Sequence, residues 1–108
     1  MAIHLAKPIK IYFASENAHD IGRLDRCFAA DAMVRDEGRT IKGIAAIKAW
    51  RSETREKYHH TVEPLSVTVR NGKTVVTAKV SDNFPGSPVT LDHVFELRGD
   101  RIVTLEIH

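Results

Sequence analysis

Two short stretches decide the fold, IKIYFASENAHD at residues 9–20 and AMVRD at residues 32–36. In the first, apolar residues recur every three or four positions, which is typical of one face of a helix, and Tyr12 lies on that face. In the second, apolar and polar residues alternate as in a half-buried strand, and Asp36 shares its face with Val34. An acid on an apolar strand face must be buried or line a pocket, where its pKa becomes unusual. The pattern therefore predicts a pocket near Tyr12 and Asp36.

Length and composition limit the class of protein. The chain has 108 residues, 43% of them hydrophobic and 28% charged, with a formal net charge of +2. This length suits a single domain over residues 1–108, and the scattered basic residues disfavour nucleic-acid binding. The single cysteine, Cys27, excludes an internal disulfide and suits a reducing compartment. No apolar run reaches the roughly 20 residues of a membrane span, and no secretory pattern opens the chain. We therefore expect a cytoplasmic protein without membrane contact.

The chain divides into a helical first half and a second half of strands. Pro8 is suited to open the first helix, and Asp20 to cap a short second one. A third helix follows Gly43, and its charged outer face is expected to begin at Arg51. Strands are expected over 32–37, 40–42, 65–70, 73–81, 89–97 and 102–107, with a two-residue hairpin turn at Asn71-Gly72. Helices followed by antiparallel strands predict an α+β domain whose helices pack on one sheet face.

The order of these elements resembles the nuclear transport factor 2-like superfamily, and within it the SnoaL-like and ketosteroid isomerase-like branch. The segments that carry the likeness are YFASENAHD at 12–20, CFAADAMVRD at 27–36, GIAAI at 43–47, HVFEL at 93–97 and GDRI at 99–102. The resemblance implies a cone-shaped, curved antiparallel β-sheet with three N-terminal helices enclosing a pocket, as in cystatin-like folds. It also implies a homodimer formed through the outer sheet face. Because this fold hosts many activities, the resemblance is more specific for fold than for function.

The resemblance also indicates which residues would act. In ketosteroid isomerases a tyrosine of the first helix and an aspartate ending the first strand are catalytic, and Tyr12 and Asp36 match those positions without a gap. A gapless match would place Asp92 at the isomerases' second aspartate. Strand phase instead puts His93 on the apolar face with Phe95, and Asp92 on the opposite face. SnoaL-like cyclases pair a histidine with an acid. The expected catalytic residues are therefore Tyr12, Asp36 and His93.

Each of these three residues is also compatible with a purely structural role. Asp36 would act as a general base on a carbon next to a carbonyl, or be a strand-end acid that meets Arg35 or Arg39 in solvent. Tyr12 would donate a hydrogen bond to a developing enolate oxygen, or be a core residue whose hydroxyl finds a nearby partner. His93 would shuttle protons, since its unperturbed pKa of about 6.5 lies near working pH, or be a hydrogen-bonded core histidine.

The remaining expectations concern ligands and partners. Side chains expected to contact a ligand are those of Phe13, Val34, Trp50 and Phe95. The sequence has no cysteine cluster, spaced histidine–carboxylate motif or glycine-rich phosphate loop, so we expect neither a metal nor a cofactor. Three functions stay open. The first is a cofactor-independent isomerase, cyclase or lyase acting on an apolar carbonyl compound. The second is a non-catalytic binder of a small hydrophobic ligand, and the third a homodimerisation module whose cavity its own side chains fill.

The outer face of the sheet bears on the expected homodimer. Residues expected to point outward are Thr68, Arg70, Thr77, Lys79 and Glu106. Such a mixed polar surface is compatible with a hydrated interface of moderate size. The homodimer is therefore expected from the resemblance more than from the pattern itself.

Overall fold

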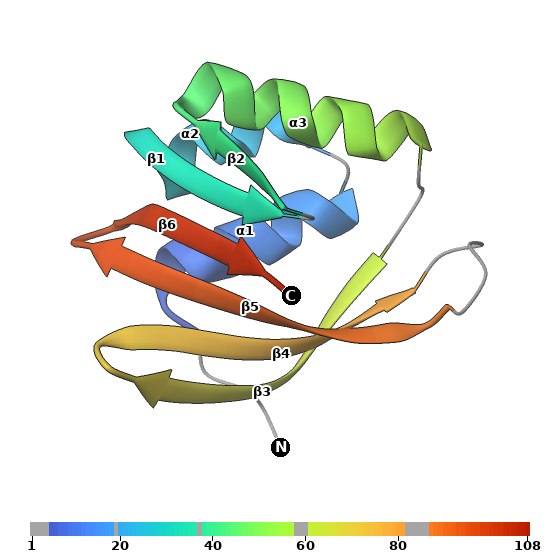
Figure 1. Cartoon of the computed structure of the whole chain (residues 1–108), viewed down its shortest axis with the longest axis vertical. Coiled ribbons are helices and arrows are strands. Elements are labelled where there is room, and N and C mark those ends of the chain that lie inside the picture. The colour runs from blue at the N-terminus through green and yellow to red at the C-terminus, as the bar shows by residue number, and fades with distance from the viewer. Residues whose placement is uncertain (1–4, 19, 37, 58–60, 82–86) are drawn as a thin grey trace.

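The computed structural model describes residues 5–18, 20–36, 38–57, 61–81 and 87–108. Along the chain its elements are α1 (Lys7–Ala18), the 3-10 turn η1 (Ile21–Arg23), α2 (Leu24–Cys27), β1 (Phe28–Asp36), β2 (Arg39–Lys42), α3 (Ile44–Lys57), β3 (Thr61–Arg70), β4 (Lys73–Ser81), β5 (Val89–Arg98) and β6 (Arg101–Ile107). The helices gather on one side of a curved sheet, with α1 behind β6 and α3 above β1 and β2 (Figure 1). The α+β class with three helices is confirmed.

The sheet has six strands in the order β2-β1-β6-β5-β4-β3. Neighbouring strands are antiparallel except for β1 and β6, which run parallel. The sheet is therefore mixed, whereas the sequence led us to expect antiparallel strands alone. The four strands from β3 to β6 form a meander in chain order, and the β1–β2 hairpin joins it beside the last strand. That docking is a long-range event, so no local pattern in the sequence reports its direction.

One row of the sheet shows where the core lies. Val34 of β1 pairs with Leu105 of β6, and Leu105 pairs with Phe95 of β5. All three side chains are fully buried, because α1 covers this face with Tyr12 and Phe13. The rings of Tyr12 and Phe13 both meet Phe95 edge to face, with centroids 5.7 and 5.9 Å apart. This inner face of the sheet is the one that the strand alternation predicted to be apolar.

A glycine with a left-handed backbone directly precedes helix α3. Gly43 has a φ of +88°, and its N–H donates to the carbonyl of Ala32 at 2.8 Å, which ties the start of the helix to β1. Ile47 and Trp50 point into the core as their spacing predicts. Arg51, however, is only 5% exposed. The expectation that it opens a charged outer face is wrong, because α1 offers it a buried partner.

The hairpin between β3 and β4 forms as predicted. Asn71 and Gly72 both have positive φ angles, 52° and 77°, as a two-residue type I′ turn requires. Strand β3 begins at Thr61, earlier than expected, and its register with β4 shifts between Pro64 and Ser66. Expected strand residue 37 and the segment 82–86 lie outside the described residues.

The early start of β3 has a visible cause in the end of α1. The side-chain amide of Asn17 donates to the carbonyl of Val62 at 2.9 Å, and its oxygen accepts from the Val62 N–H at 2.8 Å. This reciprocal pair mimics a strand partner for β3. It fixes the first residues of β3 against the helix that carries Tyr12.

Candidate functional site

Sheet register places Asp36 and His93 on the same inner face. Asp36 of β1 pairs with Ile107 of β6, and Ile107 pairs with His93 of β5. Paired residues share a face, so the two side chains lie in one row, two strands and about 10 Å apart. Asp92 lies on the opposite face, where it is exposed and accepts a hydrogen bond from Thr77 Oγ1 at 2.8 Å. The orientation predicted from strand phase is therefore correct.

An open pocket of about 530 Å³ lies where β1 and β6 end beside the start of β5. It is lined by Arg35, Asp36, Gly38, Arg39, Leu91, Glu106, Ile107 and His108. Leu91 and Ile107 supply an apolar wall, whereas Arg35 and Arg39 place cations at the rim. This volume is in the range of sites for small molecules, roughly 300–1,000 Å³. Of the three predicted catalytic residues, Asp36 is the one that lines this pocket.

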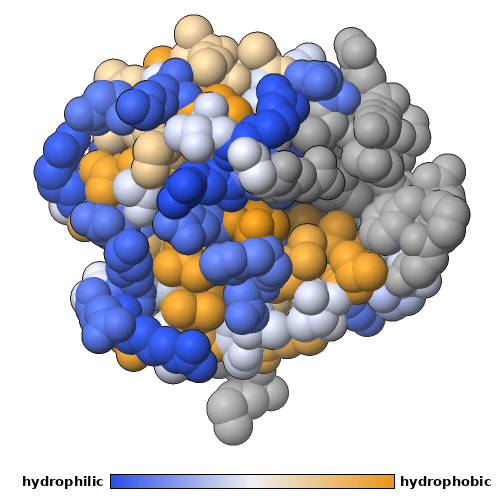
Figure 2. Space-filling view, in the orientation of Figure 1, coloured by the Kyte–Doolittle hydropathy of each residue, from blue (hydrophilic) through white to orange (hydrophobic). Residues whose placement is uncertain are grey.

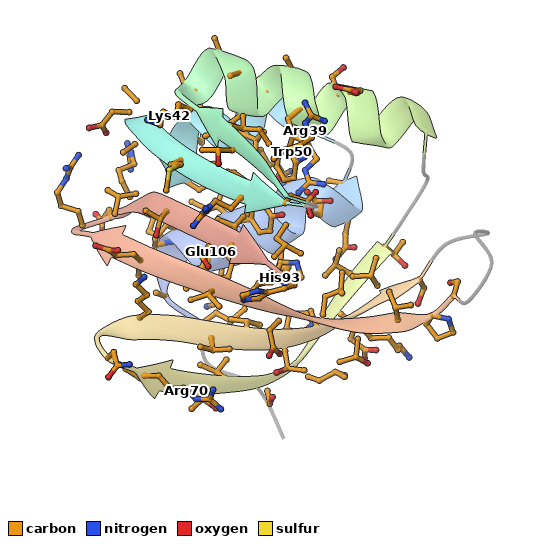
Figure 3. All side chains as sticks on the ribbon, viewed as in Figure 1. Arg39, Lys42, Trp50, Arg70, His93 and Glu106 are labelled. Atoms are coloured by element: carbon orange, nitrogen blue, oxygen red, sulfur yellow. The ribbon has the colours of Figure 1, made fainter. Side chains whose placement is uncertain are left out.

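Asp36 is half-buried and is held by helix α3. The indole Nε1–H of Trp50 donates to Asp36 Oδ2 at 3.3 Å. Figure 3 shows Trp50 and Arg39 beneath α3, toward the end of β1. Arg39 Nη1 lies 3.8 Å from Glu53 Oε1, so α3 also holds this rim residue of the pocket. The carboxylate therefore faces the pocket from a fixed position, as a base that acts on a bound ligand must.

Helices α1 and α3 share a buried polar cluster of Tyr12, Glu16 and Arg51. Arg51 Nη2 donates to the Tyr12 hydroxyl oxygen at 2.5 Å, and Arg51 Nε lies 2.5 Å from Glu16 Oε1. All three side chains are buried. Burial raises the pKa of the Tyr12 hydroxyl far above its usual 10, Arg51 opposes that rise, and the charges of Glu16 and Asp36 add to it. Tyr12 is therefore a protonated hydrogen-bond donor at every ordinary pH.

His93 is enclosed by aromatic rings. Its ring centroid lies 5.4 Å from that of Phe13, 6.3 Å from that of Tyr12 and 6.4 Å from that of Phe95, which it stacks on. Burial, and then the charge of Arg51, lower the pKa of His93 to about 4. Its Nδ1 has no hydrogen-bond partner among the residues that the structure describes. His93 is thus a neutral imidazole at pH 7, and the expected titration near working pH does not occur.

The four residues expected to contact a ligand lie in the core. Their side chains, those of Phe13, Val34, Trp50 and Phe95, are buried, and none lines the described pocket. Within the described part of the chain, no three His, Cys, Asp or Glu side chains gather in a way that would hold a metal. Among those same residues no helix is long and apolar enough to cross a membrane.

Sequence reasoning missed Arg51 and Glu16 as parts of the site. A signal for Glu16 was present, because it continues the apolar stripe of α1 that includes Ile9 and Tyr12. A carboxylate on such a face needs a buried partner. That partner, Arg51, comes from α3. The largely polar residues around it in the sequence gave no sign that its side chain points inward.

Comparisons with known proteins agree with this fold. A family model described as SnoaL-like domain matches residues 9–105. A protein from Sinorhizobium meliloti, described as a candidate polyketide cyclase, is 40% identical with a TM-score of 0.91, over 96% of this chain and 95% of that one. A Catenulispora acidiphila protein with a ketosteroid isomerase-like fold, in complex with trimethylamine, is 18% identical with a TM-score of 0.83, over 97% and 86% of the two chains. Bal32a, from a soil-derived mobile gene cassette, is 20% identical with a TM-score of 0.80, over 94% and 85%. No curated protein sequence matches the chain significantly.

Proposed function

This chain belongs to the SnoaL-like family, and from that premise we propose that it is a cofactor-independent enzyme that moves a proton on a small carbonyl compound. One observation carries the proposal. Asp36 is half-buried in the wall of an open pocket, and Trp50 holds its carboxylate in place. A fixed carboxylate beside an apolar wall suits a general base for carbon acids. The likeness to a candidate polyketide cyclase points the same way, although that description belongs to the other protein.

The proposed reaction begins when Asp36 removes a proton from the carbon next to the carbonyl of a ligand. The electron pair moves into the carbonyl, so negative charge develops on its oxygen. Tyr12, protonated and close enough to feel the charge of Asp36, donates a hydrogen bond to that oxygen. Asp36, now protonated, returns the proton to another carbon; alternatively, the enolate carbon bonds to a second carbonyl carbon, and Asp36 gives its proton to the alkoxide oxygen that forms. His93 takes part as a neutral hydrogen-bonding group, since its pKa of about 4 keeps it uncharged.

The proposed ligand is a small, largely apolar molecule with a carbonyl group. Leu91 and Ile107 would contact its hydrocarbon part, and Arg35 and Arg39 would favour polar or anionic substituents at the rim. The Catenulispora acidiphila protein in complex with trimethylamine is a precedent for a small ligand on this fold.

The test is deuterium uptake at the α-carbon of a panel of ketones and 1,3-dicarbonyl compounds in D2O, followed by NMR. We expect the unsubstituted protein to catalyse exchange and Asp36→Asn to lose about 10²–10⁴ in rate, the usual share of a general base. Asp92→Asn is the matched control, because Asp92 lies on the outer face of the sheet and is exposed. Equal exchange with Asp36→Asn and with the unsubstituted protein would refute Asp36 as the base.

The burial of Tyr12 and His93 favours a second candidate function, non-catalytic binding of a small hydrophobic ligand. A binder needs the pocket but not a base. It would therefore show no α-carbon exchange with any compound of the panel, while its ligands would still raise the melting temperature of both the unsubstituted protein and Asp36→Asn.

We also propose that the chain forms a homodimer through the outer face of its sheet. One row of that face runs through Arg35, Glu106, Val94, Val75 and Thr68, with charges at one end and valines in the middle. Figure 2 shows hydrophobic residues interspersed with hydrophilic ones over the central strands. Apolar centres with polar surroundings are typical of interfaces.

Gel filtration at micromolar concentration tests the dimer. A dimer that Val94→Glu converts to a monomer is the expected result, because the substitution places a charge at the centre of the proposed interface. The matched control is Val69→Glu, since Val69 is 70% exposed and does not belong to that row. A monomer in the unsubstituted protein would contradict the proposal. The cytoplasmic location expected from the sequence stays a prediction, which cell fractionation checks.

A further inference from the structure

We propose that Arg51 is a positioning residue that directs the Tyr12 hydroxyl proton toward the ligand, and that Glu16 holds Arg51 in place for this purpose. The inference rests on the proposed function, which assigns Tyr12 as the donor to the ligand oxygen. It is carried by two contacts, Arg51 Nη2 to the Tyr12 hydroxyl oxygen and Arg51 Nε to Glu16 Oε1, both at 2.5 Å.

The chemistry of arginine fixes the direction of the hydrogen bond between Arg51 and Tyr12. A guanidinium carries only donors, so the Tyr12 oxygen must accept from it. The hydroxyl proton of Tyr12 must then point away from Arg51. A hydroxyl that accepts from a cation is also a stronger donor, because hydrogen bonds in a chain polarise one another. Tyr12 is therefore left with one strengthened donor for a ligand.

The surroundings of Tyr12 indicate where that donor acts. His93, whose ring centroid lies 6.3 Å from that of Tyr12, has a buried Nδ1 without a hydrogen-bond partner among the described residues. A buried polar group such as this Nδ1 is costly unless something satisfies it. A ligand oxygen between the Tyr12 hydroxyl and the His93 ring would do so.

Glu16 determines the charge of this inner site. Its carboxylate and the Arg51 guanidinium form a buried pair with no net charge, with side chains 2% and 6% exposed. Arg51 therefore acts on Tyr12 through a fixed hydrogen bond, not as an uncompensated cation that would draw the hydroxyl into its ionised form. The pair also keeps Arg51 from turning toward solvent, since separating the two side chains would leave opposite buried charges apart from each other.

Helix α3 connects this donor to the base. Arg51 and Trp50 are consecutive, and the Arg51 guanidinium lies 3.8 Å from the centre of the Trp50 ring. Trp50 donates to Asp36, and Arg51 donates to Tyr12. One turn of α3 thus sets the spacing between two groups that come from β1 and α1. The ligand that fits must carry an acceptor oxygen that gains negative charge, which defines the class as carbonyl compounds and their enolate or phenolate analogues.

The test uses 4-nitrophenolate, whose oxygen mimics an enolate and whose absorbance reports its ionisation. The critical variant is the double substitution Glu16→Leu with Arg51→Met, which removes both buried charges at similar volume and is expected to fold. We expect its melting temperature to stay close to that of the unsubstituted protein, while its affinity for 4-nitrophenolate falls about tenfold or more and the bound phenol becomes harder to ionise. A merely structural role for Arg51 would change neither binding nor ionisation in this folded variant.

Three further variants complete the design. Arg51→Lys keeps a donor to Tyr12 and a partner for Glu16, so it should recover part of the affinity lost in the double variant. Lys48→Met removes a cation of the same helix that pairs with Asp25 at the surface, and should leave the affinity unchanged. Asp36→Asn should bind 4-nitrophenolate at least as tightly as the unsubstituted protein, because it removes a nearby negative charge.

The outcomes separate this inference from the proposed function. A folded double variant that binds 4-nitrophenolate as tightly as the unsubstituted protein overturns the role of Arg51, and so does the absence of any binding to the unsubstituted protein. If Asp36→Asn loses no exchange activity while the double variant loses affinity, the proposed base is wrong and the role of Arg51 stands. Loss of affinity in the folded double variant, with Lys48→Met unaffected, is the result that supports the inference.

Discussion

Two of the ion pairs that helix α3 makes differ chiefly in their surroundings. Lys48 pairs with Asp25, and their side chains are 35% and 53% exposed, whereas Arg51 pairs with Glu16, and theirs are 6% and 2% exposed. The exposed pair contributes little to the free energy of unfolding, about 0–1 kcal/mol. The attraction within the buried pair is stronger, but each of its charges depends on the other because water cannot solvate either of them. The same kind of contact is therefore marginal at the surface and obligatory in the interior.

The largest effect is expected when the inner pair is broken on one side. Arg51→Met leaves Glu16 buried without its cation, which should lower the free energy of unfolding by about 3–5 kcal/mol. Urea denaturation followed by circular dichroism measures this change. A decrease in the free energy of unfolding below about 1 kcal/mol, as expected for an exposed pair, would show that the buried pair does not differ from the exposed one.

A buried side chain that becomes charged should also lower the free energy of unfolding, and His93 tests this expectation. Its pKa is about 4 in the folded chain and about 6.5 when unfolded, so between these values the unfolded chain binds a proton that the folded chain does not. Stability should therefore be full above pH 6.5 and fall by about 3 kcal/mol as the pH drops to 4. His93→Phe should remove this part of the pH dependence. Parallel stability curves for the two proteins from pH 7 to pH 4 would show that His93 is not buried as a neutral ring.

The smallest effect is expected at the outer pair. Lys48→Met should change the free energy of unfolding by less than about 1 kcal/mol, and the change should shrink further at 1 M salt, because the Debye length there is about 3 Å. Chemical denaturation at low and high salt measures both. A salt-independent loss as large as that of Arg51→Met would mean that Lys48 contributes by packing and not by charge.

Much of the fold could be predicted because many of its features depend on residues that are close together in the sequence. The spacing of Ile47 and Trp50 in α3, the turn at Asn71 and Gly72, and the inward phase of His93 are all observed as expected. Each depends on the period of a helix or a strand, or on the backbone angles that a turn demands. The helix face, the turn and the strand phase can therefore each be predicted from residues only a few positions apart.

The candidate site could be predicted only in part. Periodicity put Asp36 and His93 on inner faces, but the parallel pairing of β1 with β6 put them in one row. The same limit explains why Arg51 was expected outside: its position next to Trp50 gave no hint of Glu16 on another helix. The ring enclosure that lowers the pKa of His93 likewise comes from α1 and β5 together.

From the sequence one could read which residues turn toward the interior in most elements, where the helices and turns fall, and which family the chain resembles. Only the packed fold revealed that Arg51 pairs with Glu16, that Trp50 donates to Asp36, and that burial keeps His93 uncharged at neutral pH. The two kinds of feature depend on interactions of different range. Backbone periodicity is local and repeats along the chain, whereas burial, charge pairing and pKa depend on atoms that only the packing of distant elements brings together.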